Sequence, residues 1–387
     1  MMTNGVAISG IGVVSGYGWG THAFWDGLCS GKPAARLMGG YGEDGQESAW
    51  LARVPEGGDP ADGEGLFGRA FLAAGREAIN DARTRGWLPA GPVGLVHVGW
   101  FNDMYGWREV SSGRAQRSRD FVRVMPSTPA AMLMKEFALH GPSLMVSASC
   151  SSSNNALLVA KQWVDSGQVE DVVVVAADLS FTPEVVAGFT RMGAAAVDVE
   201  PLEACRPFQD GGKGFPPGEA AVGLVLSSRP VGGYAHLLGG AMTSDGYHAT
   251  SMDPRHTEVI RCVAEALADA RVEPGDVAYF NAHGTGTVQC NAAEVDILER
   301  LFPGAGPKIY ALKPLVGHCI ASAGAVELAA GLLAYEHKVV PAARIVATAH
   351  PQLLNGLSDF DGGITLKTSM GMGGHNSAVV VGEPTAT

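Results

Sequence analysis

The sequence predicts an α/β fold with buried strands, and two observations lead to this prediction. Short apolar runs alternate with stretches of helical character, which is the order of elements in α/β proteins. Several runs are continuous and rich in β-branched residues, as in residues 171–177 (DVVVVAA), which is typical of strands covered on both faces. Hydrophobic residues make up 46% of the 387-residue chain and charged residues 17%, so a disordered chain is excluded.

The elements follow in chain order. The predicted strands cover residues 6–14, 93–98, 171–177, 220–226, 277–281 and 378–381. The predicted helices cover residues 70–85, 257–271 and 321–335, and Pro274-Gly275 stops the second of them. The third helix is apolar but only about 15 residues long, and it carries Glu327. A membrane span needs roughly 20 apolar residues, so we interpret it as a core helix.

Charge and cysteine content limit the possible partners and the compartment. The net charge of -12 argues against nucleic acid as a partner, because phosphate binding needs a basic face. The six cysteines are scattered without a CxxC pair, and residues 1–14 lack the basic region of a secretory peptide. We therefore expect a reduced, cytoplasmic protein that does not associate with membranes.

Cys150 is a candidate nucleophile. It lies between an apolar run and a helix that begins with Ser and Asn, which are good N-cap residues. A thiol at a helix N-terminus is close to free N–H groups and the positive end of the dipole, which stabilise its thiolate. The alternative is a buried structural cysteine. The strand-turn-helix placement, similar to the elbow of hydrolases, favours the nucleophile.

Two histidines are candidates for the same site. His283 follows a predicted strand in the glycine-rich segment HGTGT, and His318 follows Lys313 in the segment KPLVGH. Neither lies on the apolar face of a predicted helix, which weakens the interpretation as core histidines. A zinc site built from His283, Cys290, His318 and Cys319 is conceivable, but no pair has the spacing typical of structural sites.

Cys150 and His318 each precede an apolar, Ala-rich helix after a small-residue turn. The similarity of these two segments suggests two related halves of the chain, joined near residues 227–233. Chance similarity of two Ala-rich helices is the alternative. The predicted halves are residues 1–228 and 229–387, forming one compact unit.

The chain resembles the β-ketoacyl-acyl-carrier-protein synthases, condensing enzymes of the thiolase-like fold. The resemblance implies a type II polyketide or specialised fatty-acid pathway. The resemblance runs nearly end to end, through VAISGIGVVSGYG, MPSTPAAMLMKEFALHGPSLMVSASCSS, RPFQDGGKGFPPGEAAVGLVL, TSDGYHAT, NAHGTGT, KPLVGH, AGAVE and GMGGHNSAVVV. It implies two related α/β halves in a layered α-β-α-β-α arrangement, with the nucleophilic cysteine in the first half and two catalytic histidines in the second.

The resemblance also implies roles for individual residues. The implied catalytic set is Cys150, His283, His318, Lys313 and Glu294. The N–H groups of Cys150 and Met372 would form the oxyanion hole, and the implied residues for substrate and pantetheine are Thr285, Thr287, Met372 and Asn376. No metal and no cofactor are expected, because the acyl carrier protein supplies the phosphopantetheine.

Some positions depart from the family pattern. Met370 and Met372 replace phenylalanines, Asn291 stands where an aspartate often follows HGTGT, Gly212-Lys213-Gly214 replaces Arg-Asp-Gly, and Ser149 replaces an alanine. None of these changes removes a catalytic group. They leave the substrate open and indicate a specialised pathway rather than housekeeping fatty-acid synthesis.

A cluster of arginines suggests where a carrier protein docks. Five arginines lie between residues 108 and 123, in a chain of net charge -12. We favour Arg117 and Arg119 for docking an acidic carrier, with Arg206 a weaker candidate. A solvated face or a set of salt bridges between subunits is the alternative.

The resemblance implies a dimer, either of two copies or with a chain-length-factor-like homologue. Its interface is expected on the strand that leads into the nucleophile helix, namely residues 172–175 or a neighbouring strand. The predicted reaction is decarboxylative Claisen condensation of an acyl-cysteine with a malonyl-carrier thioester. The alternatives are acyl transfer without decarboxylation and a partner subunit of a ketosynthase heterodimer, and Cys150 argues against the second of these.

Overall fold

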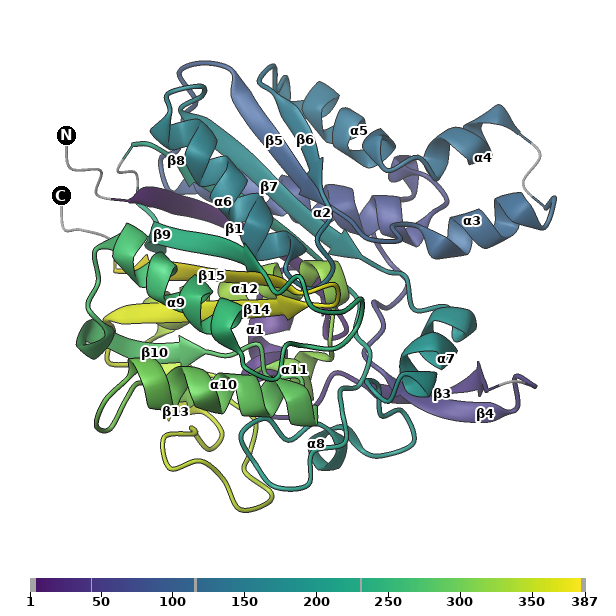
Figure 1. Cartoon of the computed structure of the whole chain (residues 1–387). Coiled ribbons are helices and arrows are strands. Elements are labelled where there is room, and N and C mark those ends of the chain that lie inside the picture. The colour runs from purple at the N-terminus through teal and green to yellow at the C-terminus, as the bar shows by residue number, and fades with distance from the viewer. Residues whose placement is uncertain (1–4, 43, 115–116, 230–231, 384–387) are drawn as a thin grey trace.

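The structure is a computed structural model that describes residues 5–42, 44–114, 117–229 and 232–383 (Figure 1). Its main sheet contains β1 (Val6–Ser15), β2 (Gly18–Trp19), β5 (Val93–Val98), β6 (Ser143–Val146), β7 (Asp171–Asp178), β8 (Ala220–Ser227), β9 (Ala235–Ser244), β10 (Val277–Asn281), β11 (Lys308–Tyr310), β14 (Ile364–Gly371) and β15 (His375–Gly382). Two small two-stranded sheets pair β3 (Arg36–Tyr41) with β4 (Glu47–Leu51) and β12 (Val339–Val340) with β13 (Ser358–Asp359).

The helices connect these strands. They are α1 (Thr21–Cys29), α2 (Leu66–Thr84), α3 (Met104–Ser111), α4 (Ser118–Arg123), α5 (Ser127–Phe137), α6 (Ser152–Asp165), α7 (Pro183–Arg191), α8 (Pro201–Ala204), α9 (Thr257–Ala270), α10 (Val288–Leu301), α11 (Lys313–Val316) and α12 (Ala323–His337). Short 3-10 turns cover Pro60–Asp62, Pro274–Asp276 and Ile320–Ser322. None of the helices in the described ranges combines the length and apolar character needed to cross a membrane.

The strand order is repeated in the two halves of the chain. The first half runs β6-β5-β7-β8-β1 and the second runs β11-β10-β14-β15-β9. In each half the first two pairings are parallel and the next two are antiparallel. A short antiparallel contact between β1 and β9 joins the halves. The placement of the boundary between residues 228 and 229 stays a prediction.

Helices lie on both faces of the sheet and between its halves. α2 packs on β1, β7 and β8, while α9 packs on β9 and β15 (Figure 1). α6 and α12 contact each other in the middle layer, where α6 also touches strands of both halves. Every residue of α12 from Ala323 to Tyr335 is buried, which explains why this helix is apolar on all sides. The predicted layered α-β-α-β-α arrangement is confirmed.

Close packing in the first half depends on glycine. A Cβ atom added at Gly12 of β1 would lie 2.2 Å from the carbonyl oxygen of Ala74 in α2. Because no side chain fits there, the backbone of α2 rests directly on the strand. The helix predicted over residues 70–85 begins earlier, at Leu66, and its first turn includes the buried Phe67.

The expectation that residues 172–175 form the dimer edge is wrong. These residues lie in β7, which is hydrogen-bonded to β5 on one side and to β8 on the other. All residues of β7 are buried. The strand at this end of the sheet is β6, which leads into the helix after Cys150 and exposes 44% of Leu144 and 39% of Met145.

Candidate active site

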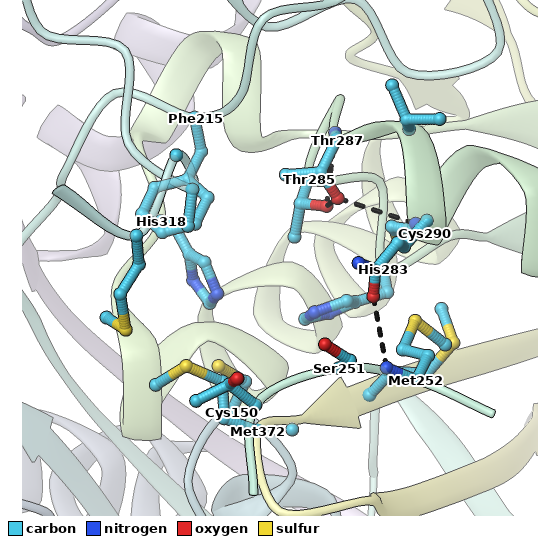
Figure 2. A pocket seen from close by; sticks show the side chains of 18 of the residues that line it. Cys150, Phe215, Ser251, Met252, His283, Thr285, Thr287, Cys290, His318 and Met372 are labelled. Atoms are coloured by element: carbon cyan, nitrogen blue, oxygen red, sulfur yellow. Dashed lines mark hydrogen bonds between the residues drawn. The ribbon is translucent and has the colours of Figure 1, made fainter. Parts of the chain in front are cut away.

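A cavity of about 450 Å³ brings together residues from both halves of the chain. Its lining includes Cys150, His283, His318 and Met372. In Figure 2, Thr285 and Thr287 lie on one side of the space and Cys150 and Met372 on the other, with the two imidazole rings between them. The segments that contribute these residues follow the ends of β6, β10, β11 and β14.

A tight turn holds Cys150 at the start of α6. Ser149 adopts a left-handed conformation with φ 52°, which is uncommon for a residue with a side chain. The hydroxyl of Ser152 donates to the carbonyl of Ser149 at 2.6 Å and accepts from the N–H of Ala148 at 2.7 Å. Gly371 closes the turn from β14, since a Cβ there would lie 3.1 Å from the nitrogen of Cys150.

The thiol of Cys150 is buried, and burial raises its pKa above the ordinary value. Three groups oppose this effect: the hydroxyl of Ser149, the positive charge of Lys313 and the backbone N–H of Met372. The resting group is therefore a thiol at neutral pH. Met372 packs in the same cluster as Cys150, and the family resemblance makes its N–H one donor of the oxyanion hole.

Glu294 fixes the backbone at His283. Its buried carboxylate accepts from the N–H of His283 at 2.6 Å and from the N–H of Gly284 at 2.9 Å. The hydroxyl of Thr368 donates to the same carboxylate at 3.2 Å. Burial raises the pKa of Glu294, and the N–H groups of Gly284 and His283 oppose the shift. The contact to His283 is thus through the backbone, and the ring is held by another group.

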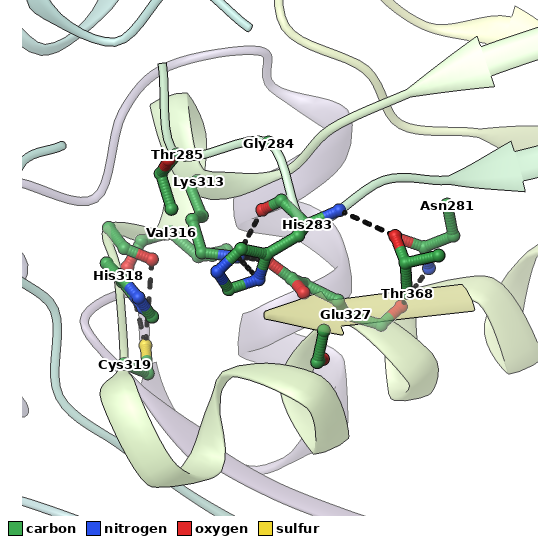
Figure 3. A network of polar contacts seen from close by, with 12 residues as sticks. Asn281, His283, Gly284, Thr285, Lys313, Val316, His318, Cys319, Glu327 and Thr368 are labelled. Atoms are coloured by element: carbon green, nitrogen blue, oxygen red, sulfur yellow. Dashed lines mark hydrogen bonds and ion pairs between the residues drawn. The ribbon is translucent and has the colours of Figure 1, made fainter. Parts of the chain in front are cut away.

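That group is Lys313, as Figure 3 shows. Its Nζ lies 3.2 Å from Nδ1 of His283, and it also donates to the carbonyl oxygen of His283 and, at 2.6 Å, to Glu327. Burial disfavours the charged form, but the carboxylate of Glu327 raises the pKa of Lys313. Lys313 is therefore an ammonium group, and Nδ1 of His283 must accept a hydrogen bond from it.

The imidazole of His318 also accepts a hydrogen bond at Nδ1, in this case from a backbone N–H. The N–H of Ile320 donates to Nδ1 of His318 at 3.2 Å. Its ring lies 5.4 Å from that of His283 and contacts the edge of Phe215 at 4.5 Å between centroids. Burial and the charge of Lys313 hold the pKa of both histidines well below the ordinary value. Both rings are neutral, and each has its Nε2–H available as a donor.

This arrangement favours two neutral hydrogen-bond donors beside a thiol over a metal site. The sulfur of Cys150 and a nitrogen of each histidine all lie within 4.8 Å of one another. Of the other conceivable zinc ligands, Cys290 donates to Glu294 at 3.3 Å and Cys319 to the carbonyl of Val316 at 3.8 Å. Because Nδ1 of each histidine accepts a hydrogen bond, Nε2 carries the proton and has no lone pair for a metal. The expectation of a site without metal stays a prediction.

Two charged residues of this network were not among the predicted site residues. The carboxylate of Glu327 lies 2.6 Å from Lys313 and 2.8 Å from Lys367, and all three side chains are buried. Burial lowers the pKa of Lys367, which the carboxylate opposes. A glutamate in an otherwise apolar helix was the available signal, because buried charges need partners.

The residues predicted to bind pantetheine line the cavity. The hydroxyls of Thr285 and Thr287 are 2.9 Å apart, and that of Thr287 also caps α10. Asn376 donates to Asp245 at 2.6 Å. The side chain of Met372 packs in the same apolar cluster as Cys150.

The arginines predicted to dock a carrier do not line the cavity. Arg117 pairs with Glu64 at 3.2 Å and with Asp120 at 3.1 Å, and Arg119 pairs with Glu64 at 3.4 Å. Arg206 pairs with Glu203, and its side chain is only 20% exposed. All these ion pairs form within the chain, so they test neither docking nor salt bridges between subunits, and docking stays a prediction.

Comparison with known proteins gives consistent matches along the chain. Residues 65–230 match the family described as β-ketoacyl synthase, N-terminal domain, and residues 234–346 match its C-terminal domain. A polyketide β-ketoacyl synthase of Streptomyces cyaneus is 29% identical over 99% of both chains. A 3-oxoacyl-[acyl-carrier-protein] synthase 2 of Staphylococcus aureus is 28% identical over 81% of both chains.

Solved structures share the fold. A type II polyketide ketosynthase, bound to a hexaketide and in complex with its acyl carrier protein, has a TM-score of 0.86 at 24% identity, over 98% of this chain and 99% of that one. The ishigamide ketosynthase/chain length factor has a TM-score of 0.85 at 24% identity with the same coverage. At this identity the likeness shows the thiolase-like fold.

Proposed function

The chain belongs to the β-ketoacyl synthase family, and we propose that it catalyses a decarboxylative Claisen condensation in polyketide or fatty-acid-type biosynthesis. An acyl group on Cys150 would react with a malonyl thioester of an acyl carrier protein. One observation carries this proposal: a buried thiol and two neutral histidines lie within 4.8 Å, each histidine having Nδ1 occupied and Nε2–H free.

In the first step Cys150 exchanges thiols with an acyl-carrier thioester. The sulfur attacks the acyl carbonyl, the bond to the carrier sulfur breaks, and the thiol proton leaves with the carrier thiol. The N–H groups of Cys150 and Met372 would bind the tetrahedral oxyanion. The position of Met372 beside Cys150 in the cavity supports this assignment.

In the second step a malonyl thioester loses CO2. The electron pair of the broken C–C bond becomes an enolate, whose oxygen would accept from the Nε2–H groups of His283 and His318. The enolate carbon attacks the acyl-Cys150 carbonyl, and the thiolate of Cys150 leaves and takes a proton from water. Neutral histidines suit this step because they donate to the oxygen without protonating the enolate carbon.

The proposed partners are an acyl carrier protein and a second ketosynthase-like chain. The carrier supplies phosphopantetheine, so no cofactor of the protein's own is proposed. The exposed apolar side chains of β6, Leu144 and Met145, suit pairing with a second chain, because an open apolar edge is otherwise an aggregation hazard. That chain is a second copy or a chain-length-factor-like homologue.

Intact-mass measurement after mixing with an acyl-carrier thioester tests the loading step. The expected result is one acyl adduct that is absent in Cys150→Ala. Adding malonyl-carrier should then release CO2 and lengthen the carrier-bound product by two carbons. Acyl transfer without CO2 release would instead favour a non-decarboxylative acyltransferase, and absence of an adduct with every donor would favour a partner subunit.

A further inference from the structure

Lys213 is the cation of the cavity wall. Among the described residues that line the cavity, it is the sole lysine or arginine. It is exposed, and within the described ranges its ammonium group forms no ion pair or hydrogen bond. In a chain of net charge -12, an unpaired cation at the opening of a cavity is available for an anion.

The backbone around Lys213 is fixed. The N–H of Lys213 donates to the carbonyl of Ala204 at 2.8 Å, and the N–H of Phe215 donates to the carbonyl of Ala194 at 3.1 Å. A Cβ at Gly214 would lie 2.3 Å from that carbonyl of Ala194. The position of the lysine is therefore set by contacts on both sides, and only its flexible side chain is free to reach a ligand.

The same segment lies against the loop that carries the two threonines. A Cβ at Gly212 would lie 2.4 Å from the carbonyl oxygen of Gly286, which separates Thr285 from Thr287 in the chain. Lys213 and the threonine hydroxyls thus belong to one continuous part of the wall. Cys150 and Met372 lie across the cavity from these threonines (Figure 2).

Other charged groups near the cavity have partners. Arg206 pairs with Glu203, and Arg255 pairs with Asp253 at 2.8 Å. Asp245, the acid of the wall, accepts from Asn376 at 2.6 Å and from the N–H of Asp253 at 3.3 Å. Among the described residues of the cavity wall, Lys213 is therefore the cation that a ligand anion would meet without a partner of its own.

We propose that Lys213 binds the phosphate of the phosphopantetheine arm, which rests on the condensing function proposed above. The arm is a linear chain with neutral amides, and its phosphate and thioester are at opposite ends. When the thioester reaches Cys150, the phosphate stays toward the opening, beyond the threonines. A lysine ammonium there gives a charge-assisted hydrogen bond to a phosphate oxygen. The alternative anion is a carboxylate on the surface of the carrier protein.

Binding of the free arm tests the proposal without relying on catalysis. Titration calorimetry with 4′-phosphopantetheine and with pantetheine compares the arm with and without its phosphate. The wild-type protein should bind the phosphorylated arm about tenfold more tightly, as expected for one hydrogen bond to a charged group. Lys213→Met should remove this preference, and Lys213→Arg should keep most of it. Lys32→Met, at an exposed lysine outside the cavity, should leave it unchanged.

Acyl loading of Cys150 separates the two sources of the anion. With acyl-phosphopantetheine and with acyl-carrier as donors, Lys213→Met should raise KM about tenfold, but it should have less than about a twofold effect with acyl-pantetheine. An effect confined to the acyl-carrier donor would overturn the proposal in favour of a carboxylate of the carrier. Equal effects with all donors would overturn it in favour of a structural role. Wild-type protein that prefers the phosphorylated arm but never forms an acyl adduct would support the phosphate site and refute the condensing function.

Discussion

Lys313 and His283 are in direct contact, with Nζ 3.2 Å from the imidazole Nδ1. The same ammonium group donates to the carbonyl oxygen of His283. An ammonium group cannot accept a hydrogen bond, so Nδ1 must carry the lone pair and Nε2 the proton. One buried lysine thus selects which ring nitrogen faces the substrate as a donor.

Replacing Lys313 should therefore impair decarboxylation more than loading. In Lys313→Met the imidazole of His283 can take either tautomer, and we expect CO2 release from malonyl-carrier to fall about 10–100-fold. Formation of the acyl adduct on Cys150, measured by intact mass, should fall less. Glu327 keeps its ion pair with Lys367 at 2.8 Å, so the fold should be retained. Equal losses in both steps would contradict selection of the tautomer.

Removing the charge of Glu327 should destabilise the protein. In Glu327→Gln two buried ammonium groups would lose their shared carboxylate, and the cost of breaking a buried pair is about 3–5 kcal/mol. Denaturant unfolding measures this loss. Glu336→Gln changes a partly exposed glutamate on the same helix, paired with Arg85, and should cost less than about 1 kcal/mol. Similar losses of unfolding free energy in both variants would show that the buried ion pairs of Glu327 stabilise the protein no more than an exposed pair does.

The enolate-stabilising role of His318 is tested in a protein that cannot be acylated. Cys150→Gln should abolish condensation but retain decarboxylation of malonyl-carrier. Adding His318→Ala to this variant removes one donor to the enolate oxygen and should lower CO2 release about 10²-fold, the usual effect of losing one such donor. Undiminished CO2 release in the double variant would show that His318 does not act in this step.

The pH dependence of the thiol should differ from that of the histidines. Because burial raises the pKa of Cys150 above its ordinary value of 9.0, the thiolate fraction at neutral pH is small and grows with pH. Alkylation of Cys150 by iodoacetamide, followed by peptide mass spectrometry, should still accelerate as pH rises through 9. Both histidine pKa values lie well below 6.5, so CO2 release by Cys150→Gln should be level across that pH. An alkylation rate that reaches its plateau near neutral pH would indicate a stabilised thiolate.

Met372 is expected to influence which acyl chains load. Its flexible side chain packs beside Cys150, and a methionine adapts to a neighbouring group more readily than a rigid ring. Met372→Phe should shift loading toward short, flexible chains, by about tenfold in relative rate if overpacking costs about 1–3 kcal/mol. Competition among short, long and polyene acyl donors measures this ratio. Met242→Phe, at an exposed position outside the cavity, is the matched control. Equal ratios of loading rates in both variants would show that Met372 only fills space and does not select the acyl chain.

Much of the site could be predicted from the sequence because its chemistry is local. Cys150 lies between a strand and a helix, His283 follows a strand in a glycine-rich loop, and His318 follows Gly317 at the end of the segment KPLVGH. Short segments of sequence are therefore enough to identify these three positions. Lys367 could not be found in this way. Its role depends on Glu327, which lies 2.8 Å away although it belongs to a distant helix, and only tertiary packing brings the two together.

The same reasoning explains the error at the edge of the sheet. The β-branched residues of β7 indicate that a strand is buried on both faces, and in that respect the prediction is confirmed. They do not indicate which strands flank it, because hydrogen bonding to neighbours runs within the sheet and not toward its faces. Pairing order depends on crossover connections, and these placed β6 at the edge.

The close contact of Gly212 with Gly286 has a consequence for how the cavity recognises its ligands. Where two main chains touch without intervening side chains, rotamer changes cannot move either segment. The backbone therefore holds Lys213 and the two threonines in one fixed part of the wall, and the acyl group on Cys150 should leave their positions unchanged. Recognition of the carrier arm would then be independent of selection of the acyl group deeper in the cavity, and each could change in evolution without the other.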